Sequence, residues 1–234
     1  MNDAAKLLTE LVGTFLFLFV IALSGLAGPL APLAIGSALM VMVYMGGHVS
    51  GAHYNPAVSF GAFLRRKIDG RTLVTYWLVQ LLAGVLAFVV GYLVSGRAPG
   101  IQPGQGVLVP SALTIEILFT AGLVLVVLNV GATPATEGNS FYGLAIGFVI
   151  MVAAFVGGPI SGGAFNPAVG FGATLGAALF HSGSWANLWL YIVGPLAGAV
   201  IGAVVHYVQA AGLQETGSRR PAPAVSGQEV TTRS

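Results

Sequence analysis

The sequence contains no cysteine and very few charged residues. Only 7% of its 234 residues are charged and 56% are hydrophobic, whereas a soluble domain is about 25% charged. The absence of cysteine excludes disulfide bonds, thiolate catalysis and zinc clusters built on cysteine. The shortage of charge excludes an ordinary soluble protein, because a chain of this size cannot cover its surface with so few charges. The composition therefore indicates a protein that crosses a membrane several times.

The motifs of enzymes and cofactor-binding proteins are also missing. The chain has no phosphate-binding glycine loop and no combination of nucleophile, histidine and acid. His48 and His53 lie near each other in the sequence, but they lack the glutamate and the spacing of a helical metalloprotease motif. We therefore predict a protein that is not an enzyme, holds no metal or other cofactor, and does not bind nucleic acid.

Six apolar stretches are long enough, or nearly long enough, to cross a membrane, which takes about 20 residues of helix. They are Leu7–Gly28, Pro32–Met45, Thr72–Val94, Ser111–Val130, Ser140–Val156 and Trp185–Val208. The second and fifth look short, and each leads into a glycine-rich stretch, Gly46–Tyr54 or Gly157–Phe165. We expect the backbone of both glycine-rich stretches to be irregular.

Asn-Pro begins each of two further apolar segments, Asn55–Leu64 and Asn166–Leu179. Proline is common in the first turn of a helix, and both segments are too short to cross a bilayer. The sequence therefore predicts two half-helices that start inside the membrane.

The two halves of the sequence repeat each other. GGHVSGAHYNPAVSFGA (46–62) aligns without gaps to GGPISGGAFNPAVGFGA (157–173), which places Asn166 111 residues after Asn55. Each half contains three spans, so the second half enters the membrane in the opposite sense, and repeats of this kind carry their sites near the midplane. We predict an all-α membrane protein with six transmembrane helices and two re-entrant half-helices. Its channel domain covers residues 1–210, with halves at about 7–94 and 111–208.

The basic residues predict the orientation of the chain. Lys6 lies near the N-terminus, and only Arg97 falls outside two groups. The first group follows the first half-helix and consists of Arg65, Arg66, Lys67 and Arg71. The second lies in the tail and consists of Arg219, Arg220 and Arg233. By the positive-inside rule, both termini are cytoplasmic. We expect residues 211–234 to form a disordered cytoplasmic tail and the membrane to be a bacterial inner membrane.

The predicted meeting point of the half-helices has a definite chemistry. Their N-termini present unpaired N–H groups and partial positive charge, and the amides of Asn55 and Asn166 add further donors. Irregular backbone is tolerated at this depth only where it is buried in protein or lines a water-filled cavity. We expect a row of carbonyl acceptors at Gly51, Ala52 and His53 and at Gly162, Gly163 and Ala164. Such a passage suits small neutral solutes and repels cations.

The paired motifs SGAHYNPAV and SGGAFNPAV, on six spans in an inverted repeat, resemble the major intrinsic protein family of aquaporins and aquaglyceroporins. The motif residues are Asn55, Pro56, Ala57, Asn166, Pro167 and Ala168. The resemblance covers about Leu7 to Val208. It implies a homotetramer with one pore in each protomer, which lies in a lipid bilayer and conducts water and small neutral solutes passively.

The resemblance also implies a second constriction, the selectivity filter. Counting along the motifs places it at Ile35, Ala154, Gly163 and Val169. The last position is usually arginine in the family. With valine there the ring is apolar and mostly small, so we predict a wide filter that passes water and solutes such as glycerol. Weaker exclusion of cations is a second expectation.

Two acidic residues leave alternatives open. Glu10 and Glu116 occupy matching places in the two halves at membrane depth, where an ionisable group is costly unless it faces inward. We interpret them as structural acids that hold the re-entrant backbone. A secondary transporter that uses them as coupling sites, a water-selective aquaporin and a closed structural protein are the alternatives.

Overall fold

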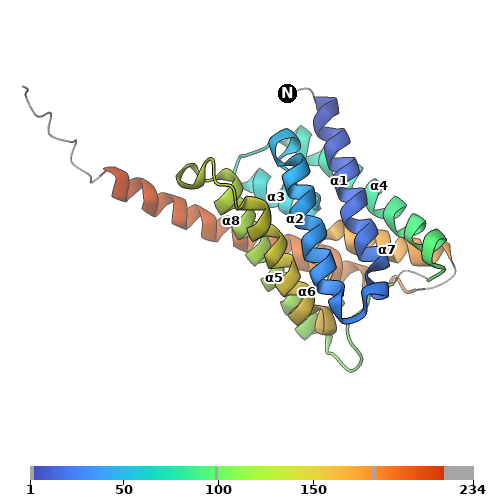
Figure 1. Cartoon of the computed structure of the whole chain (residues 1–234). Coiled ribbons are helices and arrows are strands. Elements are labelled where there is room, and N and C mark those ends of the chain that lie inside the picture. Colours follow the sequence, from blue (N-terminus) through green and yellow to red (C-terminus); the bar gives the residue numbers. More distant parts are fainter. Residues whose placement is uncertain (1–2, 98–99, 181–182, 219–234) are drawn as a thin grey trace, which may run out of the picture.

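Within its described residues the chain forms six long and two short α-helices, in the predicted order (Figure 1). The computed structural model describes residues 3–97, 100–180 and 183–218. The long helices are α1 (Asp3–Leu23), α2 (Ala31–Ser50), α4 (Gly70–Ser95), α5 (Val109–Ala132), α6 (Tyr142–Ser161) and α8 (Leu188–Ser218). The short helices are α3 (Pro56–Leu64) and α7 (Pro167–Leu179).

In the described ranges, five continuous helical stretches are long and apolar enough to span a membrane, and the first of them contains two spans. This stretch, Asp3–Ser50, joins α1 to α2 through the 3-10 turn η1 (Ser24–Leu30). Within η1 the backbone of Gly28 has φ 53° and ψ −128°, which is not helical. The five stretches therefore provide the six predicted spans.

The packing of the first half is repeated in the second. Helix α1 packs on α2 and α4, and α5 packs in the same way on α6 and α8. The half-helices cross to the other half, since α3 packs on α8 and α7 on α4, while α2 and α6 pack on each other. This pattern is the one that an inverted 3+3 repeat requires, so the predicted fold is confirmed.

Both re-entrant stretches begin later than predicted. Helices α2 and α6 continue through the first glycines and end only at Ser50 and Ser161. Gly51 and Gly162 follow as the C-caps, and their φ values of 88° and 94° suit glycine. Gly46 lies inside α2 and does not break this helix, and its lack of a side chain makes room for a close tertiary contact. A Cβ atom there would overlap the hydroxyl of Tyr54. Glycine costs a helix only about 1 kcal/mol, so long-range packing decides the local structure.

The C-terminal helix also differs from the prediction. Helix α8 begins at Leu188 rather than Trp185, and its backbone stays helical to Ser218. Residues 211–218 of the predicted tail thus continue α8, residues 219–234 lie outside the described ranges, and the disorder of the tail stays a prediction.

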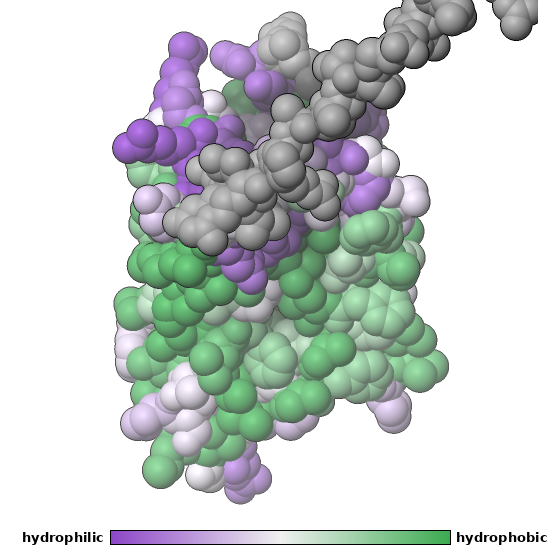
Figure 2. Space-filling model, turned by 90° about the vertical axis from the view of Figure 1, so that its left-hand side faces the viewer, coloured by the Kyte–Doolittle hydropathy of each residue, from purple (hydrophilic) through white to green (hydrophobic). Residues whose placement is uncertain are grey.

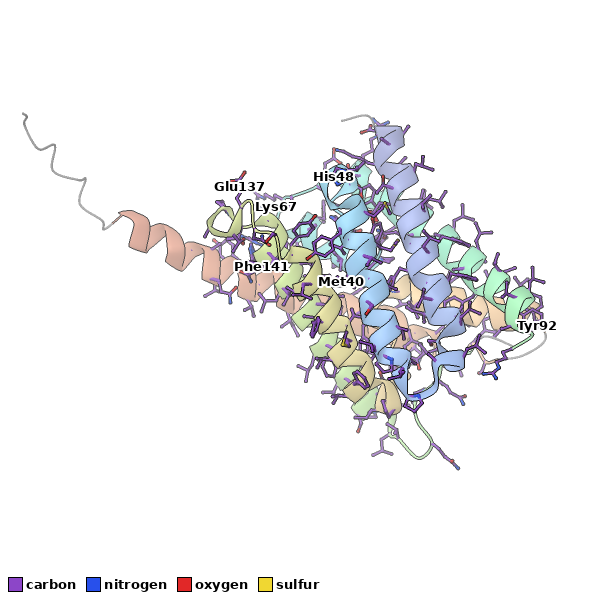
Figure 3. All side chains as sticks on the ribbon, viewed as in Figure 1. Met40, His48, Lys67, Tyr92, Glu137 and Phe141 are labelled. Carbon is purple, nitrogen blue, oxygen red and sulfur yellow. The ribbon has the colours of Figure 1, made fainter. Side chains whose placement is uncertain are left out.

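Polar residues gather at one end of the helices. Figure 2 shows an apolar band beside a strongly polar end. Large apolar side chains such as Leu78 of α4 and Val193 of α8 are exposed. We call the face at which α1 begins the inner face and the opposite one the outer face. In Figure 3, Lys67 and Glu137 lie toward the inner face, whereas Tyr92 lies toward the outer face. An apolar band between two ends is the surface that a lipid bilayer covers.

Candidate functional site: the central passage

Two short re-entrant segments, 51–55 and 162–166, lead from α2 and α6 to the half-helices. Besides the glycines at their starts, Ala52, Tyr54 and Phe165 have φ values of 50°, 48° and 49°. Such left-handed conformations are uncommon for residues other than glycine. The two segments therefore need strong contacts from the surrounding helices to keep their shape.

Glu10 supplies these contacts in the first half. Its carboxylate accepts hydrogen bonds from the backbone N–H groups of His53 (2.9 Å) and Tyr54 (2.8 Å). It also accepts one from the Ser50 hydroxyl at 2.7 Å and one from the Gln80 amide at 2.8 Å. The side chain is fully buried, and four donors compensate for the desolvation of its charge.

Glu116 makes the matching contacts in the second half. It accepts hydrogen bonds from Ala164 N at 3.0 Å, Phe165 N at 2.7 Å and the Ser161 hydroxyl at 2.7 Å. The position that matches Gln80 is Pro195, a residue without a side-chain donor. Glu116 therefore has one side-chain donor fewer than Glu10.

Asn55 and Asn166 each make two contacts at the centre. The side-chain oxygen accepts from the N–H group two residues ahead, at 2.8 Å from Ala57 and 2.9 Å from Ala168, and so caps its own half-helix. The side-chain nitrogen donates to the opposite half, from Asn55 to Phe165 O at 2.9 Å and from Asn166 to Tyr54 O at 3.0 Å. Since each amide has two N–H groups, one remains for the passage.

Three neighbouring cavities lie in a row through the molecule. An inner cavity of about 1240 Å³ shares His53 and Val127 with a middle cavity of about 20 Å³. The middle cavity shares Ile21, Ile35, Ala154 and Gly163 with an outer cavity of about 350 Å³. The cavities therefore follow one another between the two faces past the centre of the repeat, and the middle one is the smallest.

The middle cavity has apolar walls and a few polar groups. Both asparagines line it, and so do matching apolar pairs from the two halves, such as Ile35 with Ile146 and Leu39 with Ile150. Its volume of about 20 Å³ is enough for one water molecule, which needs roughly 10–15 Å³ by this measure. The centre therefore admits water-sized groups in single file.

The four predicted filter residues converge at the border between the middle and outer cavities. All four, Ile35, Ala154, Gly163 and Val169, line the outer cavity, and the first three line the middle cavity as well. Val169 is only 1% exposed, so it contributes an apolar wall. No side chain of this ring carries a charge.

The predicted carbonyl residues follow the line of cavities from face to face. Gly51 lines the inner cavity, Gly162 the outer one, and Ala52 and Ala164 the middle one, while His53 and Gly163 lie at the two borders. Within the described ranges, no hydrogen bond reaches their six carbonyl oxygens. These oxygens are thus available to solutes.

The histidines have mainly structural contacts. His53 Nδ1 lies 3.0 Å from the Ser59 hydroxyl, and His48 lines the inner cavity. His206, for which the sequence suggests no partner, is buried between Arg65 Nε at 2.9 Å and the Thr133 hydroxyl at 2.8 Å. His181 lies outside the described ranges. In the described part of the chain, no group of three or more His, Asp or Glu side chains could hold a metal ion.

Several residues along the passage were not candidates from the sequence, among them Ile21 and Arg97. Ile21 of α1 lines the middle and outer cavities, and Arg97 lines the outer cavity. Nothing in the sequence distinguishes Ile21 from the many other apolar residues of its span. Arg97 could have been found, because it is the one basic residue that the positive-inside pattern leaves on the outer side.

Two inverted half-helices that meet at an asparagine pair, on a line of cavities from face to face, define a membrane channel with a single passage in each chain. The chain belongs to the major intrinsic protein family, whose model matches residues 1–206. The predicted resemblance is thus confirmed. Because members of this family are channels, the prediction that the protein is not an enzyme is confirmed as well.

Known relatives agree with this assignment along the whole domain. The chain is 35% identical to "Aquaporin TIP1-2" of Zea mays over 222 residues, which cover 87% of this chain and 85% of the relative. It is 34% identical to "Aquaporin TIP1-1" of Arabidopsis thaliana over 226 residues, 88% of this chain and 87% of the relative. The fold matches the X-ray structure of the aquaglyceroporin from Plasmodium falciparum with a TM-score of 0.81 and 20% identity, covering 92% of this chain and 100% of that chain.

Proposed function

We propose that this protein is a passive channel for water and small uncharged solutes such as glycerol. The observation that carries the proposal is the line of three cavities, which passes the two asparagines and has unbonded carbonyl oxygens along it. Water crosses such a passage by exchanging hydrogen bonds with the carbonyl oxygens and the amide N–H groups. The relatives named as aquaporins support the assignment to water.

The asparagine pair gives the centre its selectivity against charge. The half-helix N-termini at Pro56 and Pro167 place partial positive charge on both sides of the passage, which repels cations. A water whose oxygen accepts from both Asn55 and Asn166 has no lone pair free for a proton from the next water. Proton transfer along the file is therefore interrupted at this point.

Passage of glycerol depends on the apolar wall. The middle cavity of about 20 Å³ holds about one water, so glycerol must displace side chains as it crosses. Ala154 and Gly163 form half of the filter ring and have small side chains or none. The Ile35 side chain can move aside by changing its rotamer. We therefore expect water to cross fastest and glycerol more slowly, with larger polyols excluded at the centre.

Neither glutamate supports the alternative of a coupled transporter. Glu10 and Glu116 are fully buried, accept hydrogen bonds from the re-entrant segments and line none of the three cavities. A coupling site has to exchange its proton or ion with the passage. The contacts therefore favour a channel whose acids are structural.

Stopped-flow light scattering on proteoliposomes tests the proposal. Vesicles that contain the purified protein are expected to shrink in a sorbitol gradient much faster than empty vesicles, with a low activation energy. In a glycerol gradient they are expected to swell again faster than empty vesicles. Water and glycerol rates equal to those of empty vesicles would overturn the proposal, and solute uptake against a gradient would favour the transporter.

We further propose a homotetramer in a bacterial inner membrane, with both termini cytoplasmic. The orientation rests on the basic residues of the inner face, among them Arg66 and Lys67, and the assembly rests on the family resemblance. Native mass spectrometry should give four chains in each particle. Because the chain has no cysteine, a single cysteine placed at Ser234 should react with an impermeant thiol reagent only after the cells are opened.

A further inference from the structure

Arg97 occupies a defined place at the outer end of the passage. Helix α4 ends at Gly96, whose φ of 66° turns the chain, and the N–H group of Arg97 then donates to the Ser95 hydroxyl at 3.2 Å. The guanidinium reaches toward η1, since a Cβ atom built at Gly25 would lie 3.9 Å from Arg97 Nη1. Both residues line the outer cavity.

Charged residues are sparse in the outer connections of the sequence. The three outer connections are residues 24–30, 96–108 and 180–187, and they contain one charged residue, Arg97, out of the 16 in the sequence. Among residues 3–97, 100–180 and 183–212, the other charged residues lie at the inner face or, as Glu10 and Glu116 do, inside the helix bundle near the re-entrant segments. Among the described residues that line the outer cavity, Arg97 is therefore the one that carries a formal charge.

The surroundings of this charge strengthen its effect on solutes. The outer cavity is otherwise lined by uncharged and mostly apolar residues, including the whole filter ring. Low-dielectric walls focus the field of a charge into the water between them. At a low ionic strength of 0.01 M the Debye length is about 30 Å. The field of an exposed guanidinium therefore extends across a cavity of this size.

We propose that Arg97 is a charge-selectivity residue of the outer mouth, which lowers the concentration of cations and raises that of small anions in the outer cavity. The inference rests on the proposed function, because the residue acts on what reaches the channel. It differs from the selectivity of the centre in its origin: a side-chain charge acts at the mouth, whereas backbone dipoles and amides act at the asparagine pair.

A single cysteine can measure the potential at this place directly. In the cysteine-free chain, Gly25→Cys places a thiol beside the guanidinium, in open space and on a backbone with no positive φ. The measurement is the ratio of the labelling rates by an anionic and a cationic methanethiosulfonate, sulfonatoethyl and trimethylammonioethyl. The ratio cancels the ionisation of the thiol, so it reports the local charge.

Removing the charge of Arg97 should shift this ratio toward the cationic reagent. We expect Arg97→Gln to lower the anionic-to-cationic ratio roughly three- to tenfold at 10 mM salt, and Arg97→Glu to lower it further. Arg97→Lys should restore the ratio, and 1 M salt should remove most of the difference. Arg71→Gln, an equal charge change at the first turn of α4 on the inner face, is the matched control and should leave the ratio unchanged.

The outcomes separate this inference from the proposed function. A ratio that does not respond to Arg97→Gln, or that Arg97→Lys does not restore, would overturn the role of Arg97. If Gly25→Cys does not fold, Ser24→Cys in the same cavity serves as the reporter. Water permeability of the wild type and of the Gly25→Cys protein is measured in parallel. Absence of water permeability in the wild type would refute the channel, while the labelling ratio still decides the charge at the mouth.

Discussion

Asn55 and Asn166 exchange the same hydrogen bond across the centre of the molecule. Each donates its amide to the carbonyl that directly precedes the other, at 2.9 Å to Phe165 O and at 3.0 Å to Tyr54 O. Each also caps its own half-helix through its side-chain oxygen. The pair thus joins the two halves and supplies donors to the passage with the same two side chains.

This exchange predicts that the two asparagines are equally important for stability. Asn55→Ala and Asn166→Ala each remove a cap, worth about 0.5–2 kcal/mol, and leave a buried carbonyl unpaired, at about 1–3 kcal/mol. We expect both variants to lose roughly 2–4 kcal/mol, measured by thermal unfolding in detergent. Asn129→Ala is the control, because Asn129 bonds to Leu125 O and to the exposed Gln209. A loss at only one of the two asparagines would contradict the exchange.

The two buried acids accept hydrogen bonds from unequal numbers of donors, and this difference leads to a second prediction. Replacing Glu10 or Glu116 by glutamine turns an acceptor atom into a donor that faces N–H groups of the re-entrant segment. We expect a loss of roughly 2–4 kcal/mol in each case, and a larger loss at Glu10, because the Gln80 amide also loses one of its two acceptors and keeps only the Ser59 hydroxyl. Thermal unfolding gives the stabilities.

A transport measurement on the same variants separates structure from coupling. Water permeability per folded protein should stay near wild type in Glu116→Gln vesicles that have passed a monodispersity check. It should also be independent of an imposed proton gradient in the wild type. Flux that follows the proton gradient, and is lost with Glu116, would instead identify a coupled transporter.

The half-helices and their meeting point could be predicted, because their signals are local and duplicated. Asn-Pro marks a helix start by capping and by the fixed φ of proline, and its second copy in a three-span half implies inversion. The cross bonds between Asn55 and Phe165 could not be predicted, since they depend on how two distant segments approach.

The ends of α2 and α6 were predicted wrongly for a related reason. Glycine propensity is a local term of about 1 kcal/mol, and it says nothing about what packs on the missing side chain. At Gly46 and Gly13 the space is filled by the ring of Tyr54, a residue fixed by Glu10 through its N–H group. Only the folded structure shows that these glycines make room for a tertiary contact with Tyr54.

The contact between Gly46 and Tyr54 can be tested by a double-mutant cycle. Gly46→Ala should cost roughly 1–3 kcal/mol from overpacking, because its Cβ overlaps the tyrosine hydroxyl. Tyr54→Phe removes that hydroxyl and its bond to Met42 O, so the combined variant should be more stable than the sum of the two changes predicts. Gly122→Ala in α5, with open space at its Cβ, is the control and should gain about 0.5–1 kcal/mol. Strict additivity would rule out the contact.

The last prediction concerns the two valines that follow the asparagine motifs. Val58 and Val169 occupy matching places and are both buried, at 3% and 1% exposure. Val169 lines the outer cavity of about 350 Å³, whereas Val58 lines the middle cavity of about 20 Å³. An arginine therefore has space and water at position 169 but not at position 58, where its charge would be buried without a partner. We expect Val169→Arg to fold and Val58→Arg to give little monodisperse protein.

Permeability then shows what the new side chain does to the filter. The guanidinium of Val169→Arg narrows the ring and adds donors that hold water. Glycerol permeability should fall roughly tenfold or more, which corresponds to about 1.4 kcal/mol in the barrier, while water permeability should fall much less. Stopped-flow rates for both solutes, taken on the same vesicles, give the comparison. Equal losses for water and glycerol would mean that the side chain only blocks the passage and that the ring does not select by size.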